Sequence, residues 1–305
     1  MVRQAREAEA SGFDTVLVMD HFYQLPMLGP PENEMLECYT LLSALAQHTD
    51  RVRLSALVTG NTYRNPALLA KELTTLDHVS GGRAQLGIGA GWFELEHDSL
   101  GFEFGTFTDR FERLEEALQI IKGMLAGERP AVEGRWYHVT DAINSPAPLS
   151  KIPVMIGGGG ERKTLRLVAQ YADESNLICA PNEVPRKLDA LAKHCETLGR
   201  ERAEIVVTVQ GNACVAPTHD QALAEVDAFL ASRGIDVGSM NADDAQRIRS
   251  MITLGDPDEI GEIFAARLID GVDGFTVNAA ANGHIEGRVA LLGEVLAKVV
   301  SASPH

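Results

Sequence analysis

Two adjacent side chains that can handle protons and hydrogen bonds follow a short apolar run near the start of the sequence. Asp20 and His21 come directly after Thr15–Met19. A histidine changes its charge near neutral pH and can give or take a proton, and a carboxylate can accept hydrogen bonds from a ligand ring. The pair can also be structural, with Asp20 capping a turn and His21 at the surface. The dipeptide alone leaves both interpretations open.

A run of four glycines is the second candidate site. Gly157–Gly160 ends another apolar run and is followed by Glu161, Arg162 and Lys163. Glycines let backbone N–H groups approach an anion closely, and the start of a helix adds positive potential. Because four glycines also cost conformational entropy, we favour a phosphate site, with charge from Arg162 and Lys163, over a flexible turn. The run matches neither the P-loop nor the G-x-G-x-x-G fingerprint, since Arg162 stands where the last glycine would be.

Two further segments at strand ends each have two interpretations. Gly87, Gly89 and Gly91 would fit a flat ligand pressed against a strand end, and equally a helix packed closely on a sheet. The polar stretch Thr59–Pro66 could line a cofactor or could simply cap the next helix. The histidines show no metal-ligand spacing, no G-x-S-x-G elbow is present, and none of the four cysteines forms a C-x-x-C pair. We therefore predict no metal site.

These candidates must be positioned by alternating strands and helices. The apolar patterns predict strands at 14–19, 52–59, 84–89, 153–157, 174–179, 205–215 and 275–278. They predict helices at 2–10, 34–47, 66–79, 107–125, 161–171, 184–198, 219–233, 257 onward and 286–300. Such alternation is typical of a parallel sheet with helical crossovers, and barrel enzymes of this kind carry their chemistry at the strand ends. We expect one domain over 1–305 with insertions near 92–106, 129–150 and 234–252, the last without a regular element.

The composition of the chain excludes several classes of function. The chain has 305 residues, 45% of them apolar, which suits one large α/β barrel. Its formal net charge of −16 argues against nonspecific binding to nucleic acid or to anionic membranes. No apolar stretch is long enough to span a membrane and the N-terminus has no signal-peptide core. We expect a cytoplasmic protein that acts on a small molecule, without nucleic-acid or membrane partners.

Taken together, these segments resemble the bacterial luciferase-like family, in particular its branch that depends on the deazaflavin coenzyme F420. The resemblance covers nearly the whole chain. The stretches that carry it are Gly12–His21, Leu57–Pro66, Leu76–Arg83, Gly87–Trp92, Ile156–Gly160 and Asp270–Phe275.

The resemblance implies a (β/α)8 barrel of the TIM type with insertions, and a ring system at the carboxyl ends of the strands. Asp20 and His21 would face the deazaflavin ring, with His21 as proton donor or acceptor. The strand end at Ala56–Thr59, which includes Val58 and Thr59, corresponds to a bulge, often with a non-proline cis peptide, that backs the ring in relatives. Gly91 and Trp92 would line the pocket, and Gly157, Gly158, Gly159 and Gly160 would hold the phosphate.

The implied reaction is hydride transfer between F420 and a small organic substrate that the motifs do not identify. One alternative is an FMN-dependent monooxygenase on the same barrel, because FMN also carries a phosphate and a tricyclic ring. Another is a barrel without catalytic activity that binds a cofactor or a partner. We also expect a homodimer.

One departure from the family pattern concerns the N-terminus. Relatives begin with a strand before the first helix, whereas Thr15–Met19 is the first strand-like run here and only a helix precedes it. We therefore expect seven of the eight barrel strands. The first and last strands would each lack a neighbour, and marginal stability and weakened cofactor binding would follow.

Overall fold

Parallel strands joined by helices form the framework of the protein. The computed structural model describes residues 1–302. The strands are β1 Thr15–Val18, β2 Arg53–Ala56, β3 Thr59–Gly60, β4 Ala84–Gly89, β5 Val132–Glu133, β6 His138–Val139, β7 Val154–Gly157, β8 Glu174–Leu177, β9 Val206–Val215, β10 Thr253–Gly255 and β11 Gly274–Asn278. The helices are α1 Val2–Ala10, α2 Cys38–Ala46, α3 Pro66–Ser80, α4 Glu94–Leu100, α5 Phe107–Leu125, α6 Thr164–Tyr171, α7 Val184–Leu198, α8 His219–Ser232, α9 Ala242–Arg249, α10 Pro257–Arg267 and α11 Arg288–Ala302.

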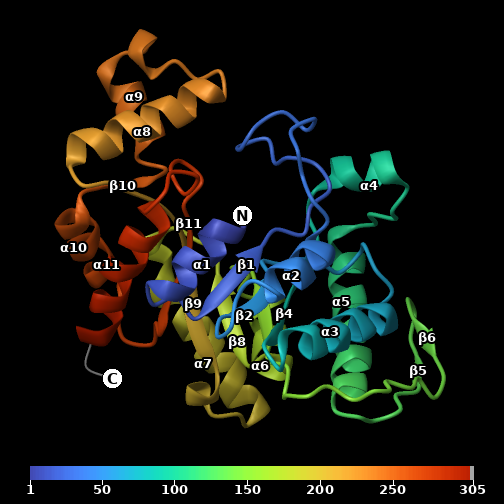
Figure 1. Ribbon diagram of the computed structural model, residues 1–305. Coiled ribbons are helices and arrows are strands. Elements are labelled where there is room, and N and C mark those ends of the chain that lie inside the picture. Colours follow the sequence, from blue (N-terminus) through green and yellow to red (C-terminus); the bar gives the residue numbers. More distant parts are fainter. Residues whose placement is uncertain (303–305) are drawn as a thin grey trace.

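Nine of the strands form one parallel sheet in the order β1-β2-β4-β7-β8-β9-β10, with β3 beside β4 and β11 beside β9. The register pairs Val18 with Ala56, Ile88 with Ile156, and Leu177 with Val209. Helices α2, α3 and α5 cover one side of the sheet, and α1 lies beside α11 (Figure 1). This is the α/β architecture that the sequence predicts.

The barrel has an open side within residues 1–302. Strand β1 pairs only with β2, and β11 pairs only with β9, so no strand joins the two edges. The residues of β1 are all half-buried, as are most of those in β11. The seven strands expected from the sequence are therefore present, and the short β3 and β10 extend the sheet without closing it.

Helix α5 has its predicted bounds, as have α1 and α7. Its N-terminus is a capping box: Thr106 Oγ1 accepts from the N–H of Asp109, whose carboxylate accepts from the N–H of Thr106. Leu114, Leu118 and Ile121 are buried in the hydrophobic core, as the apolar periodicity predicts. Phe107 differs, because it begins the helix at the molecular surface and is 60% exposed.

Three expectations for regular elements are corrected. Helix α2 begins at Cys38, not at residue 34, because the Glu37 carboxylate caps it by accepting from two N–H groups. The strand predicted at 52–59 is divided into β2 and β3, with a cis peptide bond between Leu57 and Val58. The stretch 234–250 was expected to lack a regular element, but it contains α9, whose cap is Asn241. An Asn followed by two acidic residues is an N-cap signal that the prediction overlooked.

Candidate active site at the carboxyl ends of the strands

His21 is held by a buried carboxylate that comes from helix α4. Its Nδ1 lies 2.8 Å from Oε2 of Glu96, a residue of α4 whose side chain is fully buried. The Tyr63 hydroxyl donates to the same oxygen, and the backbone N–H groups of Phe22 and Tyr23 donate to Oε1. The loop that carries His21 is therefore fixed to α4 by one carboxylate.

The ionisation of Glu96 determines which nitrogen of His21 carries the proton. Burial disfavours the charged form, but hydrogen bonds from His21, Tyr63 and Tyr23 outweigh it and lower the pKa of the carboxyl. An ionised carboxylate only accepts hydrogen bonds, so Nδ1 of His21 must donate. A neutral His21 then presents an unprotonated Nε2, which has no hydrogen-bond partner in residues 1–302. The geometry can therefore support a proton acceptor at Nε2.

Aromatic rings surround His21. The Trp92 and Phe93 rings meet its imidazole edge-on, with centroids 5.6 and 5.7 Å away, and stack on each other. Trp92 remains 53% exposed, so it separates His21 from solvent on one side and offers a free face on the other. The structure thus brings Trp92 and His21 together. Gly91, with φ +82°, makes the turn into this wall, and its carbonyl accepts from Arg110 Nε.

Asp20 lies next to His21 in the chain but faces into the protein. It is 1% exposed, and Arg64 donates to both of its carboxylate oxygens at 2.7 and 2.9 Å. The N–H of Gly60 donates to Oδ2 at 3.0 Å. Arg64 also contacts Glu37 and Glu72. The structure therefore gives the Asp20 carboxylate protein partners, and a contact between Asp20 and a cofactor stays a prediction.

Val58 lies where three strand ends meet. It follows the cis peptide bond, and its side chain occupies the space beside Gly89 and Gly157: a Cβ on either glycine would come within 2.8 Å of a Val58 methyl group. Thr59 is buried, and its Oγ1 is 2.7 Å from the Tyr39 hydroxyl. Val58 thus connects β3 and β4 to the start of the glycine run, whereas Thr59 faces the protein interior.

The glycine run forms the loop between β7 and α6. Gly158 has φ +127°, which L side chains rarely adopt, and its N–H donates to the carbonyl of Asn176. A Cβ on Gly159 would lie 2.8 Å from the Ile178 carbonyl oxygen. The N–H groups of Gly159, Gly160, Glu161 and Arg162 find no acceptor in the described part of the chain. The loop therefore offers unused donors where the sequence predicts a phosphate.

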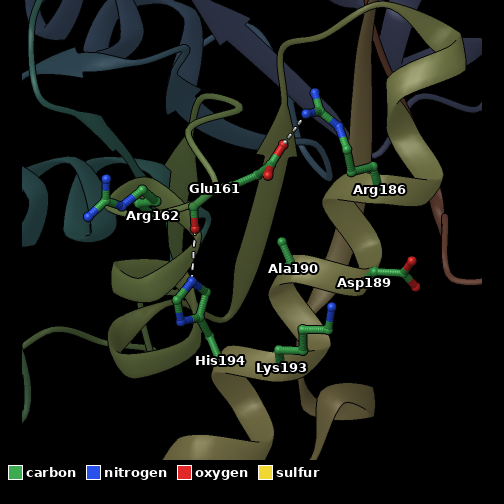
Figure 2. Close-up of a pocket in the computed structure, with 7 residues that line it drawn as sticks. All are labelled: Glu161, Arg162, Arg186, Asp189, Ala190, Lys193 and His194. Atoms are coloured by element: carbon green, nitrogen blue, oxygen red, sulfur yellow. Dashed lines mark hydrogen bonds and ion pairs between the residues drawn. The ribbon is translucent and has the colours of Figure 1, made fainter.

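The two basic residues that were expected to add charge there point in different directions. Lys163 Nζ lies over the rings of Phe107 and Phe111 and is 3.2 Å from Thr108 Oγ1. It is therefore directed toward α5. Arg162 borders a hollow between the loop and α7, but its side chain projects away from the α7 residues that line this hollow (Figure 2). Neither Arg162 nor Lys163 has a carboxylate within ion-pair distance in residues 1–302.

Several residues of this site were not predicted from the sequence. Glu96, Tyr63, Phe93 and Arg64 all contact His21, Asp20 or their partners. Arg64 and Tyr63 stand in the polar stretch that was singled out as a possible cofactor lining, which was the available signal. Glu96 lies in α4, and no local pattern in the sequence marks it.

Two kinds of feature are absent from residues 1–302. No group of three or more His, Cys, Asp or Glu side chains is arranged to hold a metal ion. None of the helices in residues 1–302 has both the length and the apolar character to cross a membrane.

Glu96→Gln is expected to lower the free energy of unfolding by about 1–3 kcal/mol at pH 7. The Glu96 carboxylate accepts four hydrogen bonds, whereas the glutamine amide would direct its NH2 group at one of these donors. The pKa of Glu96 is lower in the folded protein, so the unfolded state binds its proton first as the pH falls. The ionised Glu96 carboxylate therefore contributes its full share to the free energy of unfolding above the unfolded-state pKa of about 4.3. This contribution is lost as the pH drops through the lower pKa of the folded state. Urea unfolding of both proteins at pH 7 and pH 4 measures this. A stability difference that grows toward low pH would contradict it.

Comparison with known proteins identifies the class. Residues 1–274 match the family described as luciferase-like monooxygenase. The chain therefore belongs to the luciferase-like monooxygenase family, as the resemblance in its sequence indicates.

Individual proteins to which the chain is similar have more specific names than the family. The chain is 33% identical over 222 residues to an F420-dependent glucose-6-phosphate dehydrogenase of Microbacterium testaceum, covering 71% of this chain and 64% of that protein. It is 30% identical over 293 residues to a protein of the same name from Kineococcus radiotolerans, covering 92% and 82%. The chain thus spans just under two thirds of the first of these relatives. A solved F420-dependent secondary alcohol dehydrogenase, with an F420-acetone adduct, has the same fold, with a TM-score of 0.78 at 20% identity over 98% of this chain and 94% of that one.

Proposed function

We propose that this protein is an F420-dependent oxidoreductase that transfers a hydride between the coenzyme and a small organic substrate. Family membership and the names of its relatives support the coenzyme. The observation that carries the proposal is His21 at a strand end, with Nδ1 fixed by buried Glu96 and Nε2 unpartnered in residues 1–302. Such an arrangement suits proton transfer coupled to a hydride step.

The residues fit a ring with a phosphate side chain. The unused N–H groups from Gly159 to Arg162 suit an anion. Val58 stands between this loop and the turn that leads to Trp92. A flat ring placed at the strand ends would therefore have Val58 behind it and His21 at its side. FMN has the same two features, and we favour F420 because of the relatives.

Bound F420 would supply the hydride acceptor or donor. The protein's own contribution is orientation and proton handling. His21 would take the proton of a substrate hydroxyl at Nε2, and Glu96 would hold the imidazole in the required tautomer and stabilise its charged form. Trp92 and Phe93 would keep water away from that nitrogen. The Asp20–Arg64 pair would act indirectly, by fixing the Gly60 backbone beside the ring.

For the substrate, we propose a sugar phosphate, with glucose 6-phosphate as the first compound to test. The support is the name that two relatives share. The test offers oxidised F420 with glucose 6-phosphate, its deuterated C1 form, or a simple secondary alcohol. Loss of F420 absorbance with the sugar phosphate, slowed by C1 deuterium, supports the proposal. Reduction of F420 by the secondary alcohol, but not by the sugar phosphate, would show that the substrate is a simple alcohol. Hydride transfer to F420 would still be the reaction.

Replacing Gly159 with valine tests the phosphate site. The new side chain would crowd the Ile178 carbonyl oxygen and cover the free N–H groups of the loop. We expect affinity for F420 to fall at least about tenfold, since charge-assisted hydrogen bonds contribute about 1.5–3 kcal/mol each. Fluorescence titration measures it. Gly274→Val is the control, because Gly274 begins β11 with an ordinary backbone conformation and open space around an added Cβ. Unchanged affinity in a folded Gly159→Val protein would refute the assignment.

Three sequence predictions remain proposals. They are a single domain over 1–305, a homodimer and a cytoplasmic location. Analytical ultracentrifugation of the purified chain at several concentrations tests the second.

A further inference from the structure

A second histidine lies buried next to the residue that holds His21. His97 follows Glu96 in α4 and is fully buried. Its Nδ1 donates to the Phe93 carbonyl at 2.8 Å, and its Nε2 lies 2.7 Å from Thr62 Oγ1. Because a carbonyl only accepts, Nδ1 carries a proton, and a neutral His97 accepts the proton of the Thr62 hydroxyl at Nε2. Both ring nitrogens are therefore used within the protein.

The two hydrogen bonds of His97 hold both ends of the turn before α4. Phe93 is the last residue of this turn, and its ring meets the His21 imidazole edge-on. At the other end, a Cβ on Gly91 would lie 2.9 Å from Thr62 Oγ1, so the Thr62 side chain packs directly on the turn. His97 thus connects the start of the turn, through Thr62, to its end at Phe93.

The ring of His97 also packs against a group that holds Glu96. Its centroid lies 4.9 Å from that of Tyr63, whose hydroxyl donates to the Glu96 oxygen that holds His21. The Phe104 ring meets His97 edge-on at 4.7 Å. Within residues 1–302, no hydrogen bond or ring contact joins His97 to His21. An effect of His97 on His21 must therefore pass through these neighbours.

We propose that His97 is a positioning residue for proton transfer at His21. By fixing the turn before α4, it keeps Trp92 and Phe93 against the His21 imidazole, so that Nε2 faces the substrate. The inference rests on the proposed function, in which this nitrogen takes a proton. A misplacement of about 1 Å can lower a rate about 10²-fold. A histidine that only filled space in the core would change stability and leave the rate alone.

The test replaces His97 with phenylalanine, which keeps an aromatic ring and removes both hydrogen bonds. We expect turnover at saturating F420 and glucose 6-phosphate to fall about 10- to 100-fold. Affinity for F420 should stay within a few-fold of wild type, because the bonds of His97 do not reach the glycine run.

A second measurement needs no coenzyme. The ring centroids of His21 and Trp92 are 5.6 Å apart, so nuclear Overhauser contacts should join their ring protons in the wild-type chain. These contacts should weaken in His97→Phe, because the turn that carries Trp92 is no longer held. Thr62→Val removes one of the two hydrogen bonds with little change of shape. It should change turnover and ring contacts in the same direction by less, and it replaces His97→Phe if that variant does not fold.

His78→Phe is the matched control, because His78 also bonds a backbone carbonyl, that of Ala147 at 2.8 Å, in the last turn of α3. It should change neither measurement. Unchanged turnover in a folded His97→Phe protein would overturn the inference, and so would lower turnover with unchanged ring contacts. If the wild-type chain shows no turnover, the proposed function fails, and the ring contacts alone decide whether His97 holds Trp92 against His21.

Discussion

His21→Ala is expected to lower turnover about 10²–10⁴-fold, the usual contribution of a general acid or base, while leaving affinity for F420 within a few-fold of wild type. The imidazole contacts Glu96 and two aromatic rings rather than the glycine loop. Its loss should therefore affect proton transfer more than binding. Steady-state rates at saturating F420 and substrate measure turnover, and fluorescence titration measures the affinity.

His138→Ala provides the control, because His138 lies exposed on the β5–β6 hairpin and its loss should change neither quantity. In His21→Ala, any dependence of the rate on protonation of the imidazole should also disappear from the pH profile. Loss of F420 binding together with undiminished turnover at saturation would mean that His21 holds the cofactor and handles no proton.

Arg64→Leu is expected to lower the free energy of unfolding by about 3–5 kcal/mol, the usual result of removing one partner of a buried ion pair. The guanidinium, 9% exposed, contacts Asp20, Glu37 and Glu72. Without it, the Asp20 carboxylate would be buried with only the Gly60 N–H as a partner. Urea unfolding followed by circular dichroism measures the change.

Arg129→Leu is the control, because the Arg129–Asp141 pair is more than half exposed and such pairs contribute about 0–1 kcal/mol. If Arg64→Leu fails to fold, the double variant Asp20→Asn/Arg64→Leu decides the case. It removes both charges and should recover part of the loss. A stable Arg64→Leu protein would show that this network does not hold the strand ends together.

The fold was predictable because its signals are local. The apolar stripe and capping residues of α5, and Asn65 before Pro66 at the start of α3, fix helix positions from neighbouring residues alone. Short apolar runs that end in polar residues or glycines similarly locate β1, β4 and β7. Alternation of the two kinds of element then specifies a parallel sheet.

The site was predicted only in part because its contacts are long-range. Glu96 is 75 positions from His21, and Arg64 is 44 from Asp20. A single sequence shows neither pairing. The sequence predicts a ligand ring beside Asp20, and it does not reveal the bonds between the Asp20 carboxylate and Arg64 that the structure shows. The gap between β1 and β11, by contrast, follows from strand order alone and was expected.

Titration of the purified chain with F420 and, separately, with FMN tests the central claim most directly. The account predicts saturable binding of F420 that Gly159→Val weakens and His21→Ala leaves nearly unchanged, with FMN binding more weakly. Tighter binding of FMN than of F420, or binding of F420 that the glycine variant does not affect, would contradict it.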